Sequence, residues 1–194
     1  LLPTMQLKGS KTEQNLLKAF AGESQAKTRY EFFAGVAKKE GYEQISAFFT
    51  ETALNEKEHA ELFFKYLEGG MVEITASYPA GVIGTTAENL KAAADGEHEE
   101  WAELYPLFAQ IAKEEGFKDI SATFTLVAKV EAEHEKRYRK LLQNIVENKV
   151  FEDDENTSWT CRNCGYVHKG KNVPDLCPVC KHAKAYFERR CENY

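Results

Sequence analysis

The chain has 194 residues and a formal net charge of -6, and hydrophobic residues make up 43% of it. This length suits one domain of ordinary size with a small appendage, and the hydrophobic share is enough for a substantial core. The acidic balance argues against nucleic acid or an anionic membrane as the main partner. There is no run of about 18 apolar residues that would suggest a membrane span. The stretch 1–10 lacks the basic start and apolar run of a signal peptide, so we expect a cytoplasmic protein.

Two long helices are expected in the first part of the chain. Ser10 and Glu13 form a capping-box pattern at the start of the first helix, which runs to about Glu40. The second helix covers about 42–68 and ends at a Gly-Gly pair. Residues 71–87 contain a proline and two glycines and show no helical periodicity, so a long connection is expected there.

A second pair of helices follows this connection. Thr85 and Glu88 form another capping-box pattern at the start of the third helix, which ends near Gly116. The fourth helix covers about 117–150. The expected fold is therefore an all-α four-helix bundle with a long crossover between the second and third helices.

The two helical pairs are an internal repeat. Residues 38–46 match residues 113–121 at an offset of 75, but Glu23 matches Glu97 at an offset of 74. One extra residue therefore lies between Glu97 and Tyr105, inside the third helix. Because an extra residue within a helix is usually absorbed as a π-bulge, the change of offset predicts a bulge there.

The pattern Glu-x-x-His occurs once in each pair, at Glu56 and His59 and again at Glu131 and His134. Residues three apart share a helix face, and in both copies the rest of that face is apolar. An acid and an imidazole in an apolar stripe are costly unless something compensates them, and a metal ion is the usual compensation. Two copies in the same setting therefore favour a metal site.

Helical rise brings these side chains to one level with two further glutamates. Glu23 lies 18 residues before Gly41 and Glu56 lies 15 after it. At about 1.5 Å per residue both are roughly 22–27 Å from the turn, and the second pair gives the same result. A Glu from each of two helices and Glu-x-x-His from each of the other two is typical of ferritin-like di-iron and di-manganese proteins. The expected ligands are Glu23, Glu56, His59, Glu97, Glu131 and His134.

Glu100 adds a fifth carboxylate, one turn from Glu97. Its repeat partner is Gln25 or Ala26, so the two metals should have unequal surroundings. Two divalent ions would offset four of the five negative charges. Oxygen ligands with two imidazoles suit iron or manganese better than copper, with zinc left open.

A second metal site is expected near the C-terminus. An acidic linker over 151–158 separates the bundle, residues 1–150, from a module over 159–194 that is too short for a core without a metal staple. Two CxxC pairs form a four-thiolate site that serves mononuclear iron and structural zinc equally. Its ligands are Cys161, Cys164, Cys177 and Cys180, which leaves Cys191 as a free thiol.

These motifs resemble the rubrerythrin family along nearly the whole chain. The resemblance rests on five stretches: 21–24, 55–59, 96–100, 131–134 and the two CxxC pairs with their neighbours. It implies a di-iron bundle followed by a rubredoxin-like module, with iron in the four-cysteine site and zinc as a substitute. Rubredoxins usually have Gly directly after the second CxxC, where this chain has Lys181, so the turn there is open.

The resemblance also implies an activity. A protein of this family is a cytoplasmic peroxidase that reduces hydrogen peroxide to water in oxidative-stress defence. Its electrons come from NAD(P)H through a rubredoxin or a separate reductase and pass through the four-cysteine iron. It is a homodimer in which the four-cysteine iron of one subunit lies near the di-iron site of the other.

Several further residues have candidate roles. In the family pattern His59 and Glu100 are alternative ligands of one iron, exchanged as the redox state changes. Tyr30 and Tyr105 lie on or near the inner stripe of their helices, which makes them candidates to hydrogen-bond the ligand carboxylates, with core packing as the alternative. His182 either sits between the metal centres of the dimer or lies at the surface.

Two other functions stay open. An iron-oxidising storage or sequestration protein, as in ferritins, would share the bundle, but storage needs no one-electron relay, so the four-cysteine module counts against it. A sensor that detects oxygen or peroxide at the di-iron site without turnover would carry the same ligands. A red colour bleached by dithionite would indicate iron, and not zinc, in the four-cysteine site.

Overall fold

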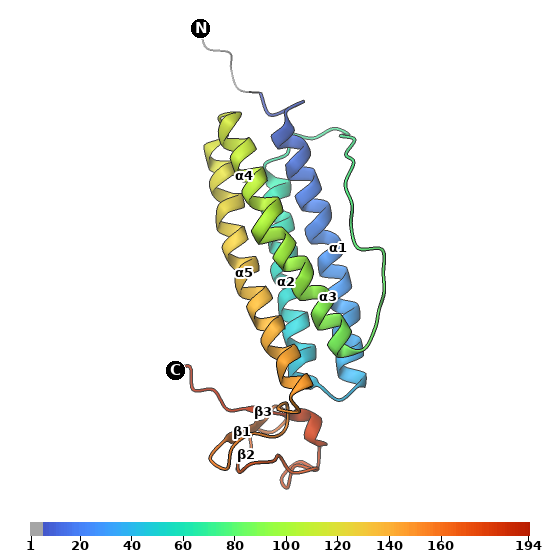
Figure 1. Ribbon diagram of the computed structural model, residues 1–194, viewed down its shortest axis with the longest axis vertical. Helices are drawn as coiled ribbons and strands as arrows, with labels where there is room; N and C mark the ends of the chain where they lie inside the picture. The colour runs from blue at the N-terminus through green and yellow to red at the C-terminus, as the bar shows by residue number, and fades with distance from the viewer. Residues whose placement is uncertain (1–5) are drawn as a thin grey trace.

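The computed structural model describes residues 6–194, so the first five residues of the stretch searched for a signal peptide lie outside the described part. These residues form a four-helix bundle with a small module at one end (Figure 1). The bundle contains α1 (Lys11–Lys39), α2 (Glu43–Lys65), α3 (Thr86–Glu99), the π-helical segment η1 (Glu100–Leu104), α4 (Tyr105–Glu114) and α5 (Lys118–Val146). The expected ferritin-like fold class is confirmed.

The predicted helix starts are present. Ser10 Oγ accepts a hydrogen bond from the Glu13 amide at 3.0 Å, while the Glu13 carboxylate accepts from the Gly9 amide instead of that of Ser10. Thr85 and Glu88 make the full reciprocal capping box. Each cap provides acceptors for amides that have no partner within the first turn of the helix.

The fourth helix ends four residues earlier than the expected position 150. Asn148 adopts a left-handed conformation with φ of 55°, and the Lys149 amide bonds to the Asn144 carbonyl at 2.7 Å. This pattern is the usual way in which a helix closes its last carbonyls. The second helix likewise ends at Lys65, three residues before the expected end.

The third expected helix is α3, η1 and α4 in series, which Figure 1 shows as one continuous rod. The π-helical segment lies between Glu97 and Tyr105, so the predicted bulge is confirmed. Within it, the Tyr105 amide bonds to the Glu100 carbonyl five residues back. Pro106 follows and has no amide hydrogen to offer the next carbonyl of the ladder.

The long crossover runs outside the bundle from the end of α2 to the start of α3 (Figure 1). Tyr78 Oη donates to the Lys18 carbonyl of α1 at 2.7 Å, and the Thr86 amide donates to Glu40 Oε2 at 2.9 Å. These contacts hold the crossover against α1. Because the crossover returns along the length of the bundle, α2 and α3 run parallel to each other (Figure 1).

The hydrophobic core of the bundle consists of two clusters, one on either side of the acidic layer. One cluster lies toward the C-terminal module and includes Tyr30, Phe33, Ile45, Phe49, Leu90 and Tyr138. The other lies toward the far end and includes Leu16, Phe63, Tyr105, Phe108, Phe124 and Val127. The acidic side chains of the middle layer are therefore sealed by apolar packing from both ends.

The C-terminal module is a three-stranded antiparallel sheet of order β2-β1-β3 with a short 3₁₀ helix. Its elements are β1 (Ser158–Cys161), β2 (Val167–Lys169), η2 (Lys184–Tyr186) and β3 (Phe187–Arg189). Trp159 is fully buried, and its Nε1 donates to the Gly170 carbonyl at 2.8 Å.

Part of the expected linker is packed. The Asp153 amide bonds to the Lys171 carbonyl, and the Val173 amide bonds to the Phe151 carbonyl, so this segment pairs with the module. The Phe151 ring stacks on Tyr42 of the bundle, with centroids 6.1 Å apart and planes 5° from parallel. The junction between the two units is thus held by an aromatic contact that the acidic composition of the linker did not indicate.

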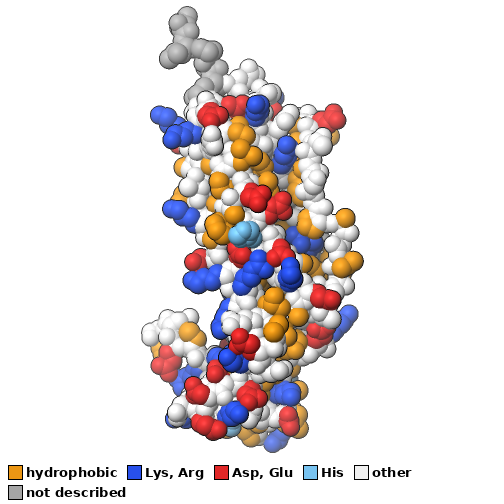
Figure 2. Space-filling view, viewed as in Figure 1, with side chains coloured by type: hydrophobic (Ala, Val, Ile, Leu, Met, Phe, Trp, Pro, Cys, Tyr) orange, Lys and Arg blue, Asp and Glu red, His pale blue; other side chains and the backbone are white. Residues whose placement is uncertain are grey.

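The surface fits the moderate net charge. Figure 2 shows acidic and basic side chains interspersed over the visible face, with apolar side chains between them. In the described part of the chain, no helix has the length and apolar character needed to cross a lipid bilayer.

Candidate metal centres

Six side chains from four helices meet in the middle of the bundle, in two groups whose ligand atoms lie within 4.8 Å of one another. The first group is Glu23, Glu56, His59 and Glu131. The second group is Glu56, Glu97, Glu131 and His134. Glu56 and Glu131 belong to both groups, as expected of carboxylates shared by two metal ions. All six residues are buried.

The two groups have nearly the same geometry. His59 Nδ1 lies 3.1 Å from Glu56 and 2.8 Å from Glu131. His134 Nδ1 lies 3.0 and 2.8 Å from the same two residues. The distances follow from the internal repeat, because each Glu-x-x-His turn occupies the same place in its helical pair.

The ligand atoms of the cluster are better suited to binding metal ions than to hydrogen-bonding one another. Six buried ligand atoms make no hydrogen bond: Glu23 Oε2, Glu56 Oε1, Glu97 Oε2, both carboxylate oxygens of Glu131, and His134 Nδ1. Among the described residues, the only ion-pair partners of these four glutamates are His59 and His134. Buried carboxylates with so few partners are costly, and two divalent ions compensate them.

Without metal, protons compensate part of this charge. Burial raises the pKa of Glu23 and of Glu97 well above the ordinary range, and the Glu56 carboxylate adds to both shifts. Burial also acts to raise the pKa of Glu56, but the imidazoles of His134 and His59, 3.0 and 3.1 Å away, lower it to about 2. Burial acts to lower the pKa of His134, but the carboxylates of Glu131 and Glu56, 2.8 and 3.0 Å from its Nδ1, raise it to about 12. The cluster therefore holds excess protons that a metal must displace.

Both expected tyrosine contacts are present. Tyr30 Oη donates to Glu97 Oε1 at 2.5 Å, and Tyr105 Oη donates to Glu23 Oε1. The two tyrosines are 75 residues apart and serve the two carboxylates that belong to only one group each. Each phenol therefore fixes the orientation of one ligand carboxylate, as partners of metal ligands usually do.

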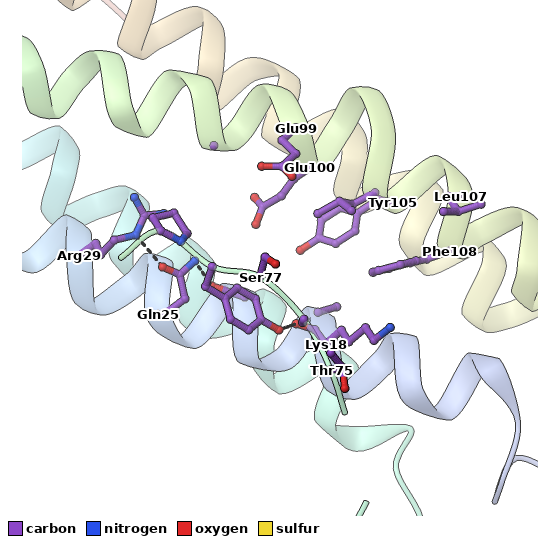
Figure 3. Close-up of a pocket in the computed structure, with 17 residues that line it drawn as sticks. Lys18, Gln25, Arg29, Thr75, Ser77, Glu99, Glu100, Tyr105, Leu107 and Phe108 are labelled. Carbon is purple, nitrogen blue, oxygen red and sulfur yellow. Dashed lines mark hydrogen bonds between the residues drawn. The ribbon is translucent and has the colours of Figure 1, made fainter. Parts of the chain in front are cut away.

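Glu100 lies outside both groups. It is the first residue of η1, and it lines a cavity of about 360 Å³ between α1, the α3–η1–α4 rod and the crossover (Figure 3). A Cβ atom added at Gly22 would lie 3.8 Å from Glu100 Oε1 and 3.6 Å from the Tyr78 ring. Burial, followed by the Glu97 carboxylate, raises the pKa of Glu100. In this structure His59, and not Glu100, is a member of the first group.

Several residues near the site were missed or misplaced by the sequence interpretation. Ser77 and Tyr78 of the crossover line the cavity, but the crossover has no periodicity that could have indicated this. Trp101 is only half-buried, and its Nε1 donates to Glu135 Oε2 at 2.6 Å. His98 is exposed, and its Nδ1 lies 3.0 Å from the same carboxylate oxygen.

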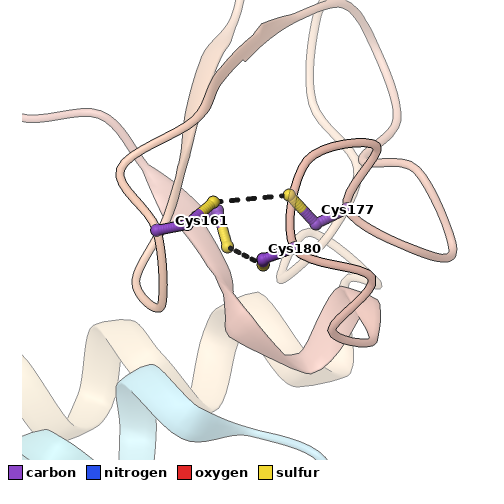
Figure 4. A group of neighbouring side chains, drawn as sticks. Cys161, Cys177 and Cys180 are labelled. Atoms are coloured by element: carbon purple, nitrogen blue, oxygen red, sulfur yellow. Dashed lines mark hydrogen bonds between the residues drawn. The ribbon is translucent and has the colours of Figure 1, made fainter.

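The four-cysteine site is also assembled (Figure 4). The Sγ atoms of Cys161 and Cys180 are 3.8 Å apart, and those of Cys164 and Cys177 are 3.6 Å apart. Metal–sulfur bonds of about 2.3 Å in a tetrahedron give sulfur–sulfur edges of about 3.8 Å. The spacing therefore fits one metal ion and is too long for disulfides.

Each CxxC pair forms a tight turn, or knuckle, closed by the residue that follows its second cysteine. Lys181 closes the second knuckle in the left-handed conformation that Gly165 adopts in the first. Gly165 has φ of 78° and its amide bonds to the Cys161 carbonyl at 2.8 Å. Lys181 has φ of 61° and its amide bonds to the Cys177 carbonyl at 2.9 Å. The departure from the usual Gly therefore leaves the knuckle intact, although a side chain at this φ is strained.

His182 and Cys191 lie outside the four ligands. His182 Nδ1 is 3.2 Å from the Cys180 carbonyl and 3.3 Å from Asn163 Nδ2. Cys191 is exposed near the C-terminus as a free thiol.

Together these features define a class: a four-helix carboxylate protein for two metal ions, joined to a rubredoxin-like four-cysteine module. The family model described as Rubrerythrin matches residues 14–142, and the one described as "Rubrerythrin, rubredoxin-like domain" matches residues 159–188. The chain belongs to the rubrerythrin family, so its two sites are those of a di-iron centre and a rubredoxin-like iron centre.

Individual relatives agree with this. The chain is 64% identical over 188 residues to a rubrerythrin of Porphyromonas gingivalis, covering 97% of this chain and 94% of the relative. It is 56% identical over 182 residues to a rubrerythrin of Nitratidesulfovibrio vulgaris, covering 94% and 95%. A solved structure of nigerythrin in a mixed-valence state superposes with a TM-score of 0.62 at 31% identity, covering 94% of this chain and 90% of that one.

Proposed function

We propose that this chain is a cytoplasmic non-haem di-iron peroxidase that defends against oxidative stress. One hydrogen peroxide, two electrons and two protons give two waters. Electrons come from NAD(P)H through a rubredoxin or a reductase, and enter the chain at the four-cysteine iron. The observation that carries the proposal is the combination, in one chain, of a two-metal cluster with a module suited to single electrons.

The metal ligands in this proposal are the residues that the fold brings together. The iron pair is held by Glu23, Glu56, His59, Glu97, Glu131 and His134, and the single iron by Cys161, Cys164, Cys177 and Cys180. When bound, the iron pair supplies both electrons at the place where the peroxide bond breaks. The burial of the cluster keeps bulk water away from that place.

The protein's own residues orient the site. Tyr30 and Tyr105 hold Glu97 and Glu23 through their phenol hydrogen bonds, so these carboxylates stay in place as the charge of the site changes. The cavity under the crossover is lined by Tyr105, which bonds to the ligand Glu23, and has room for peroxide.

Glu100 is proposed to exchange with His59 as the redox state changes. Two features support this. Glu100 is carried by the π-helical segment, and the first half of the chain has no carboxylate at the matching place. In the structure Glu100 stands one turn from Glu97 and lines the cavity, and the proposed exchange is a turn of its side chain from the cavity toward the first group.

We also propose the homodimer that the family resemblance implies, with the four-cysteine iron of one subunit near the di-iron site of the other. Light scattering on the purified protein tests the oligomeric state.

A pair of cysteine variants in the full chain tests the function. Cys180→Ser removes one ligand of the four-cysteine iron, whereas Cys191→Ser changes a free, exposed thiol and is the matched control. With NADH, a rubredoxin reductase and hydrogen peroxide, we expect Cys191→Ser to match the unchanged protein and Cys180→Ser to lose turnover. An iron-storage protein would show no NADH-coupled peroxide reduction in any of the three. Equal rates in all three proteins would exclude the relay role of the module.

A further inference from the structure

Each half of the bundle surrounds its metal-site tyrosine with three aromatic rings, and the two sets match at an offset of 75. The set around Tyr30 is Phe33, Phe49 and Tyr138, and the set around Tyr105 is Phe108, Phe124 and Phe63. Tyr30 and Tyr138 have ring centroids 5.5 Å apart, and Tyr105 and Phe63 have centroids 5.6 Å apart. The same packing is therefore used twice.

The two sets differ in one hydroxyl group. Tyr138 in one half takes the place of Phe63 in the other. Tyr138 is fully buried and its Oη makes no hydrogen bond. A buried hydroxyl without a partner costs free energy, and Phe63 shows that the packing does not need it. The hydroxyl therefore requires an explanation other than core packing.

A polar path leads from this hydroxyl to the surface. Thr52 is buried and stands one turn after Phe49 on α2, and the Phe49 ring lies 5.1 Å from the Tyr138 ring, so Thr52 is the polar side chain of α2 beside the Tyr138 ring. Thr52 Oγ1 accepts a hydrogen bond from Arg137 Nη2 at 2.7 Å, and Arg137 Nη1 pairs with the exposed Glu51 at 2.7 Å.

The other half has no such path. The positions that match Thr52, Arg137 and Glu51 at an offset of 75 are Val127, Leu62 and Leu126, all apolar. The hydroxyl of Tyr138 and its polar path thus occur together in one half and are absent together from the matching positions of the other. The Tyr138 ring, where this path begins, contacts the ring of Tyr30, and the Tyr30 phenol bonds to the metal ligand Glu97.

We propose that Tyr30 and Tyr138 form a redox relay that carries one oxidising equivalent from the di-iron site to the Arg137 surface. The inference rests on the proposed peroxidase function, since peroxide is the oxidant. The relay acts when hydrogen peroxide reaches a di-iron site that holds only one of the two electrons needed to reduce it.

The relay has two steps. Tyr30 supplies the missing electron, and its phenol proton moves to Glu97 Oε1, the hydrogen-bond acceptor 2.5 Å away. Tyr138 then reduces Tyr30 across the ring contact, Tyr30 takes back its proton from Glu97, and the proton of Tyr138 leaves past Thr52 to water. In sum, one peroxide, one stored electron, one solvent proton and the electron and proton of Tyr138 give two waters and a Tyr138 phenoxyl radical.

Tyr105 cannot pass an oxidising equivalent toward the surface in the same way. Its phenol also bonds to a ligand carboxylate, that of Glu23, but its ring neighbours are phenylalanines. A phenylalanine ring is much harder to oxidise than a phenol. In the described part of the chain, Tyr138 is the only phenol among the ring neighbours of Tyr30 and Tyr105, so the relay leads away from the ligands through Tyr138.

The test uses the full-length iron-loaded protein, reduced with less dithionite than its iron requires and mixed with hydrogen peroxide. Peroxide loss is recorded, organic radicals are trapped by rapid freezing for electron paramagnetic resonance, and oxygen addition is mapped by peptide mass spectrometry. We expect a phenoxyl signal and modification at Tyr138 and Tyr30, with Tyr105 unmodified. In Tyr138→Phe we expect loss of modification at position 138 and more of it at Tyr30.

A transplant of the path is the matched control. The variant Phe63→Tyr, Val127→Thr, Tyr138→Phe moves the hydroxyl and its threonine to the other half, and should move modification to position 63. Equal modification of Tyr30 and Tyr105 in the unchanged protein, or a Tyr138→Phe pattern identical to it, would overturn the relay even if the transplant failed to fold. Absence of peroxide loss would overturn the peroxidase function as well, whereas peroxide loss with a symmetric pattern overturns the relay alone.

Discussion

His59 and His134 face each other across the shared glutamates, with ring centroids 6.0 Å apart and ring planes 26° from parallel. Each presents Nδ1 to Glu131 at 2.8 Å, one to each carboxylate oxygen. This near-symmetry is a direct result of the internal repeat, so every one-sided feature of the site stands out against it. Glu100 in η1 and Tyr138 beside Tyr30 are two such features.

The metal-free protein should lose stability as the pH rises. Burial raises the pKa of Glu23 and Glu97 above the ordinary value of 4.5, so the folded chain keeps protons that the unfolded chain releases above that pH. His134, with a pKa raised from 6.5 to about 12, adds the same effect above pH 6.5. Each such group removes up to about 1.4 kcal/mol of stability per pH unit within its window.

Thermal unfolding of the metal-free and iron-loaded forms checks this. The midpoint of the metal-free form should fall steadily from pH 5.5 to pH 8.5, because the unfolded state binds fewer protons throughout. Metal binding displaces the protons, so the gain in midpoint on loading should grow over the same range. A metal-free midpoint that rises with pH would show that the buried glutamates are not protonated.

Glu100→Gln should keep all three metal ions but slow peroxide turnover by about 10–100-fold, the usual cost of changing a residue that supports a metal site. The six clustered ligands remain, while the carboxylate proposed to exchange with His59 is lost. Metal analysis and steady-state rates test this, with Glu99→Gln, at the adjacent last residue of α3, as the control. Unchanged rates in Glu100→Gln would remove the exchange.

Lys181→Gly should stabilise the four-cysteine module by about 1 kcal/mol, because only Gly adopts a positive φ without strain. Lys181 has φ of 61°, and its Nζ donates to the Pro178 carbonyl at 2.8 Å, a contact whose loss offsets part of the gain. The rate of iron loss to a chelator measures the effect. Gly165→Ala, at the matching knuckle, should speed iron loss. If Gly165→Ala lost iron more slowly than Lys181→Gly, the two knuckles would not be equivalent.

The sequence predicted what depends on local pattern and on the repeat. Periodicity gave the four helices, and helical rise placed Glu23 and Glu56 at one level. The change of offset from 75 to 74 located the π-helical segment, because an extra residue must be accommodated within a helix. These features are set by residues close together in the chain.

The features that the sequence could not supply depend on contacts between distant segments. The position of Glu100 outside the cluster depends on which side-chain conformation the π-helical segment permits. Tyr78 covers the cavity because the crossover packs on α1, and no periodic pattern marks a crossover. The stacking of Phe151 on Tyr42 joins residues over a hundred positions apart. Tyr138 differs from these features, because the internal repeat in the sequence is enough to match it with Phe63 at an offset of 75.

The central claim is that electrons pass from the four-cysteine iron to peroxide through the di-iron site. Stopped-flow absorption of the fully reduced protein, mixed with hydrogen peroxide, tests it most directly through the return of the red four-cysteine band. We expect the band to return quickly in the unchanged protein and to stay bleached in Glu131→Ala, which removes a carboxylate common to both metal groups. Return of the band at the same rate in both proteins would contradict the claim, because peroxide would then be oxidising the four-cysteine iron without the di-iron site.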